Sequence, residues 1–125
     1  MTIASEFDAV LDDEGLKNLT SAAYDDLPFG SIKLDRASRI TLYNRAESVL
    51  ARRDAQEMLG KLFFEEVAPC TNNVMFRGRL DELVRSGIKS ARFDYLFLFA
   101  WGSRPVRIQL WVPDAETRWI FVLPL

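Results

Sequence analysis

Apolar and polar side chains alternate through the last third of the chain, a pattern typical of β-strands. The apolar positions are Phe93, Tyr95, Phe97 and Phe99, followed by Val106, Ile108 and Leu110. Side chains two residues apart lie on one face of a strand, so these runs predict two half-buried strands, over 90–101 and around residue 108. A polar turn at 113–116 then leads into a third strand over 119–123.

A shorter alternation earlier in the chain predicts a β-hairpin. A turn at 35–38 separates two pairs of apolar residues at alternate positions, Ile32 with Leu34 and Ile40 with Leu42.

Short helices are predicted between this hairpin and the last three strands. The first covers about 44–52, and Asp54 with Glu57 has the spacing of a capping box that starts another, which Gly60 can end. A longer helix is predicted over 76–86, and its apolar face and C-terminal stop are Leu80, Leu83, Val84 and Gly87.

The first 28 residues predict an acidic helical cap. They carry a net charge of −6, whereas residues 29–125 carry +4. Apolar residues recur within them at helical spacing, at Phe7, Val10, Leu11, Leu16 and Leu19. We therefore expect one domain, with a cap at 1–28 and a core at 29–125. The element order predicts an α+β fold: a central antiparallel sheet of about five strands, short helices on one connection, and an N-terminal helical cap.

Composition excludes several kinds of chemistry. The chain has no histidine and a single cysteine, Cys70, so the commonest general base is missing and a metal site is disfavoured. A net charge of −2 disfavours a nucleic-acid binder, and no apolar run is long enough to span a membrane. Because the N-terminus has no secretory signal pattern and one cysteine makes no internal disulfide, we expect a cytoplasmic protein, and not an enzyme.

Three stretches, LPFGSIKLD, LYNRAE and GKLFFEEVAPCT, follow one another with VAPC at a fixed distance from YNRAE. From about residue 27 to residue 121 the chain resembles the photoactive yellow protein family of PAS-domain blue-light receptors. The resemblance implies a PAS-like fold. It also implies a chromophore, 4-hydroxycinnamic acid (p-coumaric acid), joined to Cys70 as a covalent thioester.

The resemblance further implies roles for residues around the chromophore. Tyr43 and Glu47 match the pair that hydrogen-bond its phenolate oxygen, with Glu47 as the proton donor. Arg53 matches an arginine that shields the chromophore from solvent. The other chromophore-binding positions are Phe63, Ala68, Tyr95, Phe97, Phe99 and Trp101.

Elementary chemistry agrees with these roles and leaves alternatives open. Tyr43 and Glu47 are four residues apart on a helical stretch and share a face, and burial would keep Glu47 protonated. Otherwise Cys70 is a small buried apolar side chain, Glu47 an exposed helix glutamate and Arg53 a surface arginine. The aromatic stripe of residues 93–99 is more often an ordinary sheet core than a cofactor site, although one face can be both.

The resemblance implies a photocycle. Light isomerises the chromophore from trans to cis, and Glu47 then transfers its proton to the phenolate. An unpaired buried carboxylate is strongly destabilising and can release a weakly held element. We expect the acidic cap to be that element, its release to be the signal, and the release to depend on salt.

Several positions depart from the family pattern. Ala51 stands where the family often has a threonine that supports the tyrosine, Phe99 replaces a tyrosine, and Gln109 replaces a histidine. Trp101 stands in place of a methionine that assists return to the trans form, so dark recovery is expected to be slower here.

Two other functions remain open at this point. One is a PAS module that binds a small apolar ligand or a partner without a photocycle, since one fold serves many functions. The other is an enzyme that uses Cys70 and Glu47, although nothing positions a second base beside them. For the sensor we expect no nucleic-acid or membrane partner, a monomer or weak dimer, and an unknown downstream signalling protein reached by non-covalent contact.

Overall fold

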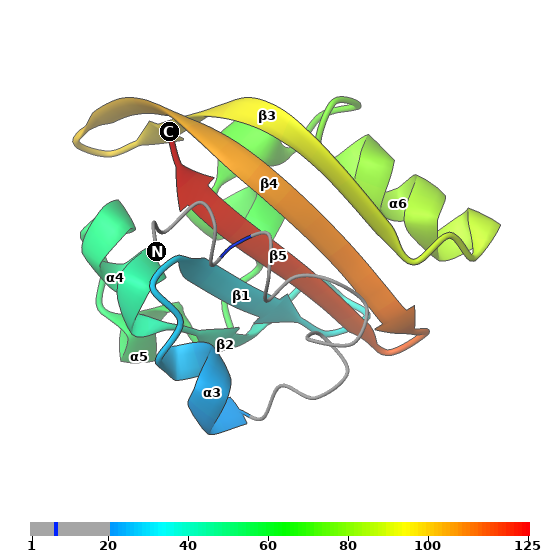
Figure 1. Ribbon diagram of the computed structural model, residues 1–125, viewed down its shortest axis with the longest axis horizontal. Coiled ribbons are helices and arrows are strands. Elements are labelled where there is room, and N and C mark those ends of the chain that lie inside the picture. Colours follow the sequence, from blue (N-terminus) through cyan, green and yellow to red (C-terminus); the bar gives the residue numbers. More distant parts are fainter. Residues whose placement is uncertain (1–6, 8–20) are drawn as a thin grey trace.

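A five-stranded antiparallel sheet forms the centre of the computed structural model, which describes Phe7 and residues 21–125 (Figure 1). The strands are β1 (Gly30–Leu34), β2 (Ile40–Tyr43), β3 (Ser90–Phe99), β4 (Gly102–Asp114) and β5 (Thr117–Pro124). Their order across the sheet is β2-β1-β5-β4-β3. The last strand therefore lies between the two hairpins and joins them into one sheet.

Among the described residues, every helix except α3 (Ser21–Asp25) lies on the connection between β2 and β3. Along that connection come α4 (Arg45–Ala51), α5 (Ala55–Met58), the π-helix η1 (Phe63–Val67), the 3₁₀ turn η2 (Pro69–Thr71) and α6 (Arg77–Ser86). Within the described residues this arrangement confirms the predicted α+β fold with its helices on one connection.

The sequence signals at the helix ends act as expected. Asp54 accepts hydrogen bonds from the backbone N–H groups of Gln56 and Glu57 at the start of α5. Gly87 ends α6 in the left-handed conformation that glycine adopts without strain. The apolar face of α6 is narrower than predicted: Leu80 and Leu83 are buried, but Val84 is 39% exposed. Val84 is the next residue round the helix and points away from the sheet.

The aromatic strand ends earlier than its alternation suggests. β3 stops at Phe99, which pairs with Gly102, so Ala100 and Trp101 form the turn of the β3–β4 hairpin. Gly102 has φ of +146°, a value that side-chain-bearing residues rarely adopt. Trp101 is thus a turn residue, outside the alternating face of the strand.

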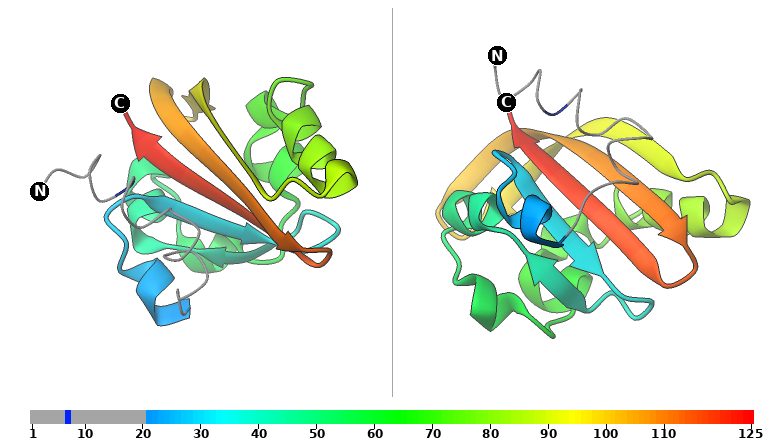
Figure 2. Two further views of the ribbon diagram at one scale, coloured as in Figure 1. Left: turned by 45° about the vertical axis from the view of Figure 1, so that its right-hand side comes forward. Right: turned by 60° about the horizontal axis from the view of Figure 1, so that its bottom comes forward.

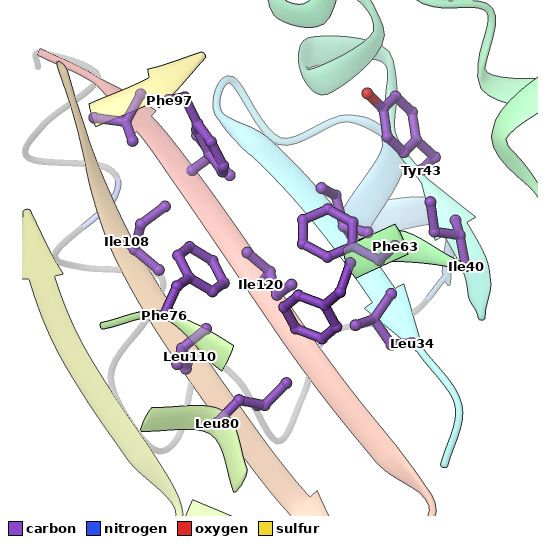
Figure 3. Close-up of a cluster of buried hydrophobic side chains, with 14 of the residues drawn as sticks. Leu34, Ile40, Tyr43, Phe63, Phe76, Leu80, Phe97, Ile108, Leu110 and Ile120 are labelled. Atoms are coloured by element: carbon purple, nitrogen blue, oxygen red, sulfur yellow. The ribbon is translucent and has the colours of Figure 1, made fainter. Parts of the chain in front are cut away.

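Two hydrophobic clusters lie on opposite faces of the sheet. The inner one packs beneath the helices, where Phe63 and Phe76 meet Leu80, Ile108, Leu110 and Ile120 (Figure 3). The outer one is aromatic and consists of Phe7, Tyr24, Phe29, Trp111, Trp119, Phe121 and Leu123. Figure 2 shows α3 and α6 on opposite sides of the sheet, in keeping with these two clusters.

Most of the predicted acidic cap falls outside the described residues, including Val10, Leu11, Leu16 and Leu19. Phe7 is described and fully buried, and its ring packs edge-to-face on Phe29 with 4.9 Å between centroids. No helix in the described part of the chain is long and apolar enough to cross a membrane.

Candidate functional site

A cavity of about 50 Å³ lies between the β1–β2 hairpin with α4, the turns η1 and η2, and the end of β3. It brings together eight of the ten residues singled out from the sequence: Tyr43, Glu47, Arg53, Phe63, Ala68, Cys70, Phe97 and Phe99. The remaining wall comes from Ile32, Ala51, Val67, Leu98 and Ala100. Residues that span more than fifty positions of the chain therefore converge on one site.

The polar end of the cavity is built by the junction of β2 and α4. Tyr43 is the last residue of β2, and Asn44 caps α4 by accepting a hydrogen bond from the backbone N–H of Glu47 at 3.0 Å. Because the cap fixes where the helix starts, it also fixes Glu47 in the first turn of α4, close to Tyr43 at the end of β2.

Glu47 points into the protein and is only 3% exposed. Its Oε1 atom has no hydrogen-bond partner within the described part of the chain. Burial disfavours the charged form and raises the pKa of Glu47 to about 8. At neutral pH the carboxyl therefore keeps its proton and is a hydrogen-bond donor at the cavity wall. The exposed helix glutamate that the sequence left open does not occur here.

A glycine on β1 makes room for this carboxyl. A Cβ atom on Gly30 would lie 2.2 Å from Glu47 Oε1, far closer than Cβ atoms approach other heavy atoms in proteins. Gly30 therefore allows Glu47 to sit against the strand.

Tyr43 is buried next to Glu47, and its pKa is raised well above the usual range. Burial is the main cause, the charge of Glu47 adds to it, and the positive charge of Arg53 opposes it. The phenol is consequently neutral at physiological pH and can donate a hydrogen bond beside Glu47.

The turns η1 and η2 bring Cys70 to the cavity. Cys70 is half-buried on η2, with Ala68 and Phe63 on the preceding turns. Pro69 occupies the first position of η2, where its fixed φ favours the turn. These turns carry the VAPC stretch and place the sulfur atom on the cavity wall.

Arg53 forms the mouth of the cavity. Its side chain is exposed to solvent and lines the cavity at the same time. Ser48 Oγ donates a hydrogen bond to the backbone oxygen of Arg53 and ties this segment to α4. The backbone of Arg53 is thus fixed at the solvent-exposed side of the cavity.

Tyr95 and Trp101 lie beside the cavity and do not line it. The Tyr95 hydroxyl donates a hydrogen bond of 2.6 Å to the backbone oxygen of Cys70. Trp101 stacks on Phe99 with 5.2 Å between centroids, and its Nε1–H donates to the backbone oxygen of Leu50 at 2.9 Å. The Arg52 guanidinium lies 4.6 Å from the centroid of the Trp101 ring. The indole therefore links the β3–β4 turn to the end of α4.

The residues present fit the chemistry of a thioester-linked hydroxycinnamoyl group. A cysteine and two protonated oxygen donors, Tyr43 and Glu47, line the same cavity. The volume of about 50 Å³ is smaller than the roughly 150 Å³ that holds a benzene ring, so wall side chains must move apart when an aromatic group enters.

Comparison with known proteins agrees with the fold. The family model described as "PAS fold" matches residues 18–122. Photoactive yellow protein from Rhodothalassium salexigens is 36% identical over 113 residues, 88% of this chain and 89% of that protein. Photoactive yellow protein from Rhodobacter capsulatus is 38% identical over 102 residues, 81% of this chain and 82% of that protein.

A solved structure gives the same answer. The photoactive yellow protein domain from the sensor histidine kinase Ppr of Rhodospirillum centenum superposes with a TM-score of 0.77 at 39% identity, covering 87% of this chain and 96% of that domain. The protein is therefore a PAS domain of the sensory kind. Within that class, the chain belongs to the photoactive yellow protein family.

Proposed function

We propose that this protein is a blue-light photoreceptor that carries a 4-hydroxycinnamoyl group on Cys70 as a thioester. The observation that carries the proposal is Glu47, a protonated carboxyl whose buried Oε1 atom has no hydrogen-bond partner in the described part of the chain, on the wall of the cavity that Cys70 also lines. An unsatisfied buried polar atom costs about 1–3 kcal/mol, so a ligand oxygen that pairs with it binds favourably.

When bound, the group supplies visible-light absorption, a double bond that isomerises from trans to cis, and a phenolate oxygen. Tyr43 and Glu47 donate hydrogen bonds to that oxygen, and Arg53 keeps water from the cavity mouth. After illumination Glu47 gives up its proton and becomes a carboxylate. A charge of this kind, buried away from a counter-ion, is destabilising by several kcal/mol.

The unfavourable charge on Glu47 affects α3 through the hydrogen bonds of Asn44. The Asn44 Oδ1 atom accepts from the backbone N–H groups of Glu47 and Ser31, at 3.0 and 2.9 Å. Its Nδ2 atom donates to the backbone oxygens of Tyr24 and Phe29, at 2.9 and 3.0 Å. One buried side chain thus connects the first turn of α4 with α3. Displacement of α4 loosens this end of the cap, which we propose is the signal.

The cap would then contact a downstream signalling protein in the cytoplasm without a covalent link. Asp25 of α3 already pairs with α4, because its Oδ1 accepts a hydrogen bond from the Arg45 backbone N–H at 3.2 Å and its Oδ2 lies 3.7 Å from the guanidinium. Release of α3 separates these charges and exposes the aromatic surface beneath.

The decisive experiment is a visible spectrum of the protein after reaction with activated 4-hydroxycinnamic acid. We expect the wild type to turn yellow and to bleach reversibly under blue light. Cys70→Ala, treated in parallel, should stay colourless. A colourless wild type would instead support a PAS module that binds a ligand or partner without a photocycle.

A further inference from the structure

The segment that carries Cys70 is short and has few means of orienting the thiol. η2 is a single turn of three residues between η1 and α6, and the residues at its two ends, Ala68 and Asn72, have irregular backbone angles. A side chain on such a turn is only as well placed as the peptide groups around it. The contacts of the Cys70 peptide group therefore decide where its sulfur points.

Two side chains hold the Cys70 carbonyl from outside the cavity. The Tyr95 hydroxyl donates to the Cys70 oxygen at 2.6 Å, and Asn73 Nδ2 donates to the same oxygen at 3.0 Å. Asn73 Nδ2 also donates to the Tyr95 hydroxyl oxygen at 2.8 Å. The three groups form a closed triangle of hydrogen bonds, with both lone pairs of the carbonyl in use.

The triangle is anchored on both sides. Tyr95 lies on β3, and its ring packs on Phe76 with 5.2 Å between centroids. Asn73 Oδ1 accepts a hydrogen bond from the Phe76 backbone N–H at 3.0 Å, just before α6. Phe76 itself is fully buried. The Cys70 carbonyl is thus fixed to both the sheet and the start of α6.

We propose that Asn73 and Tyr95 are positioning residues for acylation of Cys70, which rests on the proposed function. In that reaction the Cys70 sulfur attacks the carbonyl carbon of an activated hydroxycinnamic acid. The new S–C bond forms as the bond to the leaving group breaks; the leaving group keeps that electron pair, and the thiol proton passes to solvent. Asn73 and Tyr95 touch neither reactant atom and act by holding the backbone, so that the sulfur faces the cavity.

Asn73→Asp separates this role from helix capping. The substitution keeps the oxygen that accepts from Phe76, but it replaces the donor that faces the Cys70 carbonyl with a second acceptor. The new carboxylate also attracts the Tyr95 hydroxyl, which frees the Cys70 carbonyl from both donors. Tyr95→Phe removes one donor and leaves Asn73 in place. Asn72→Asp is the matched control, because it adds the same charge one residue away, where Asn72 contacts Arg77.

The test compares two reagents on the unloaded protein: activated 4-hydroxycinnamic acid, which must enter the cavity, and iodoacetamide, which is small. We expect Asn73→Asp to slow acylation by about three- to tenfold and Tyr95→Phe by about two- to fivefold. Alkylation by iodoacetamide should change less than about twofold, since a thiol that leaves the cavity wall stays reactive. The carbonyl-carbon chemical shift of Cys70 should move in Asn73→Asp and stay in Asn72→Asp.

The inference is overturned if Asn73→Asp acylates as fast as the wild type, if Asn72→Asp slows the reaction equally, or if both reagents slow together. A wild type that reacts with iodoacetamide but never with the activated acid overturns the proposed function itself, which keeps the two failures distinct.

Discussion

Glu47 is the residue whose ionisation dominates the energetics of the site. Its pKa of about 8 in the folded protein lies above the value of about 4.3 for an exposed glutamate. Between these two values the folded protein keeps a proton that the unfolded chain has released. The associated stability is therefore complete at acidic pH and is lost as the pH rises through about 8.

We expect the free energy of unfolding of the unloaded protein to fall by a few kcal/mol, on the order of the shift in pKa, between about pH 5 and pH 8. Glu47→Gln, which cannot ionise, should flatten this dependence. Urea unfolding followed at a series of pH values measures both. An equal slope in wild type and variant would show that another group is responsible.

Gly30 is a second residue with a measurable effect. In Gly30→Ala the new methyl group would take the space of Glu47 Oε1, so the carboxyl must leave its position. We expect a loss of about 1–3 kcal/mol in unfolding free energy. The infrared carbonyl band of the protonated carboxyl should shift as well.

Gly78→Ala serves as the control for Gly30→Ala. Gly78 lies in α6, and the nearest atom to its new Cβ is 3.5 Å away, an ordinary contact. Alanine is the better helix former, so this variant should be stabilised by about 0.5–1 kcal/mol. A Gly30→Ala protein as stable as wild type, with an unmoved band, would contradict the close approach.

The sequence predicts some of these residues better than others. The sequence identifies Tyr43 and Glu47 as a pair, but the helical stretch expected to carry both was wrong. Tyr43 ends β2 and α4 begins only after the Asn44 cap, so the strand–helix junction brings the two residues together. The approach of Gly30 to Glu47 and the contacts of Asn73 with Tyr95 depend on how β1 and β3 pack against the connection. No local pattern indicates such contacts, although Asn73, just before a helix, has the character of a capping residue.

At the scale of elements, Trp101 connects the β3–β4 turn with the end of α4, two segments at the rim of the cavity. Its hydrogen bond to the Leu50 oxygen and its stack between Phe99 and Arg52 join the β3–β4 turn to α4. Arg52 has φ of +57° and ends α4 in the left-handed conformation, where glycine is usual. The cation–π contact with Trp101 offsets part of that strain.

Trp101→Met should accelerate dark recovery of the loaded protein. The flexible thioether removes the hydrogen bond to Leu50 and the ring stack, so the rim opens more readily for the return to trans. Loss of one hydrogen bond of about 1 kcal/mol corresponds to roughly a fivefold faster recovery. The return of visible absorbance after a flash measures the rate. Unchanged recovery would mean that the rim does not limit it.

Element boundaries could be predicted where alternation or capping was clear, as in the β1–β2 hairpin and α5. Trp101 shows the limit of such patterns. As the second apolar residue after Phe99 it continues the alternation of β3, yet the pairing of Phe99 with Gly102 ends the strand two residues earlier. The partner strand, and not the strand's own sequence, sets where it ends.

At the scale of the whole molecule, the sheet separates the cavity from the aromatic cluster that receives the N-terminal region. Tyr24 stacks on Trp119 with 3.7 Å between centroids, and Phe7 packs on Phe29. Asn44 is the buried polar link between the two sides. A change in the position of Glu47 can therefore reach α3 without passing through the sheet.

We expect illumination of the loaded protein to increase hydrogen exchange in α3 and at Phe7, and Asn44→Ala to change that increase. High salt should enlarge it, because residues 1–28 carry −6 against +4 on the rest and the Debye length falls from about 8 Å to about 3 Å at 1 M. Exchange that responds to neither light nor salt would contradict release of the cap.

The buried Glu47 carboxyl also allows proton uptake by the protein to be measured from the pH of the solution. The chain has no histidine, the side chain that ordinarily buffers near neutral pH. A proton that passes from Glu47 to a group inside the closed cavity leaves the acidity of the solution unchanged. Proton uptake from the medium begins only when water reaches the new carboxylate. An indicator dye in weakly buffered solution therefore times the opening of the cavity.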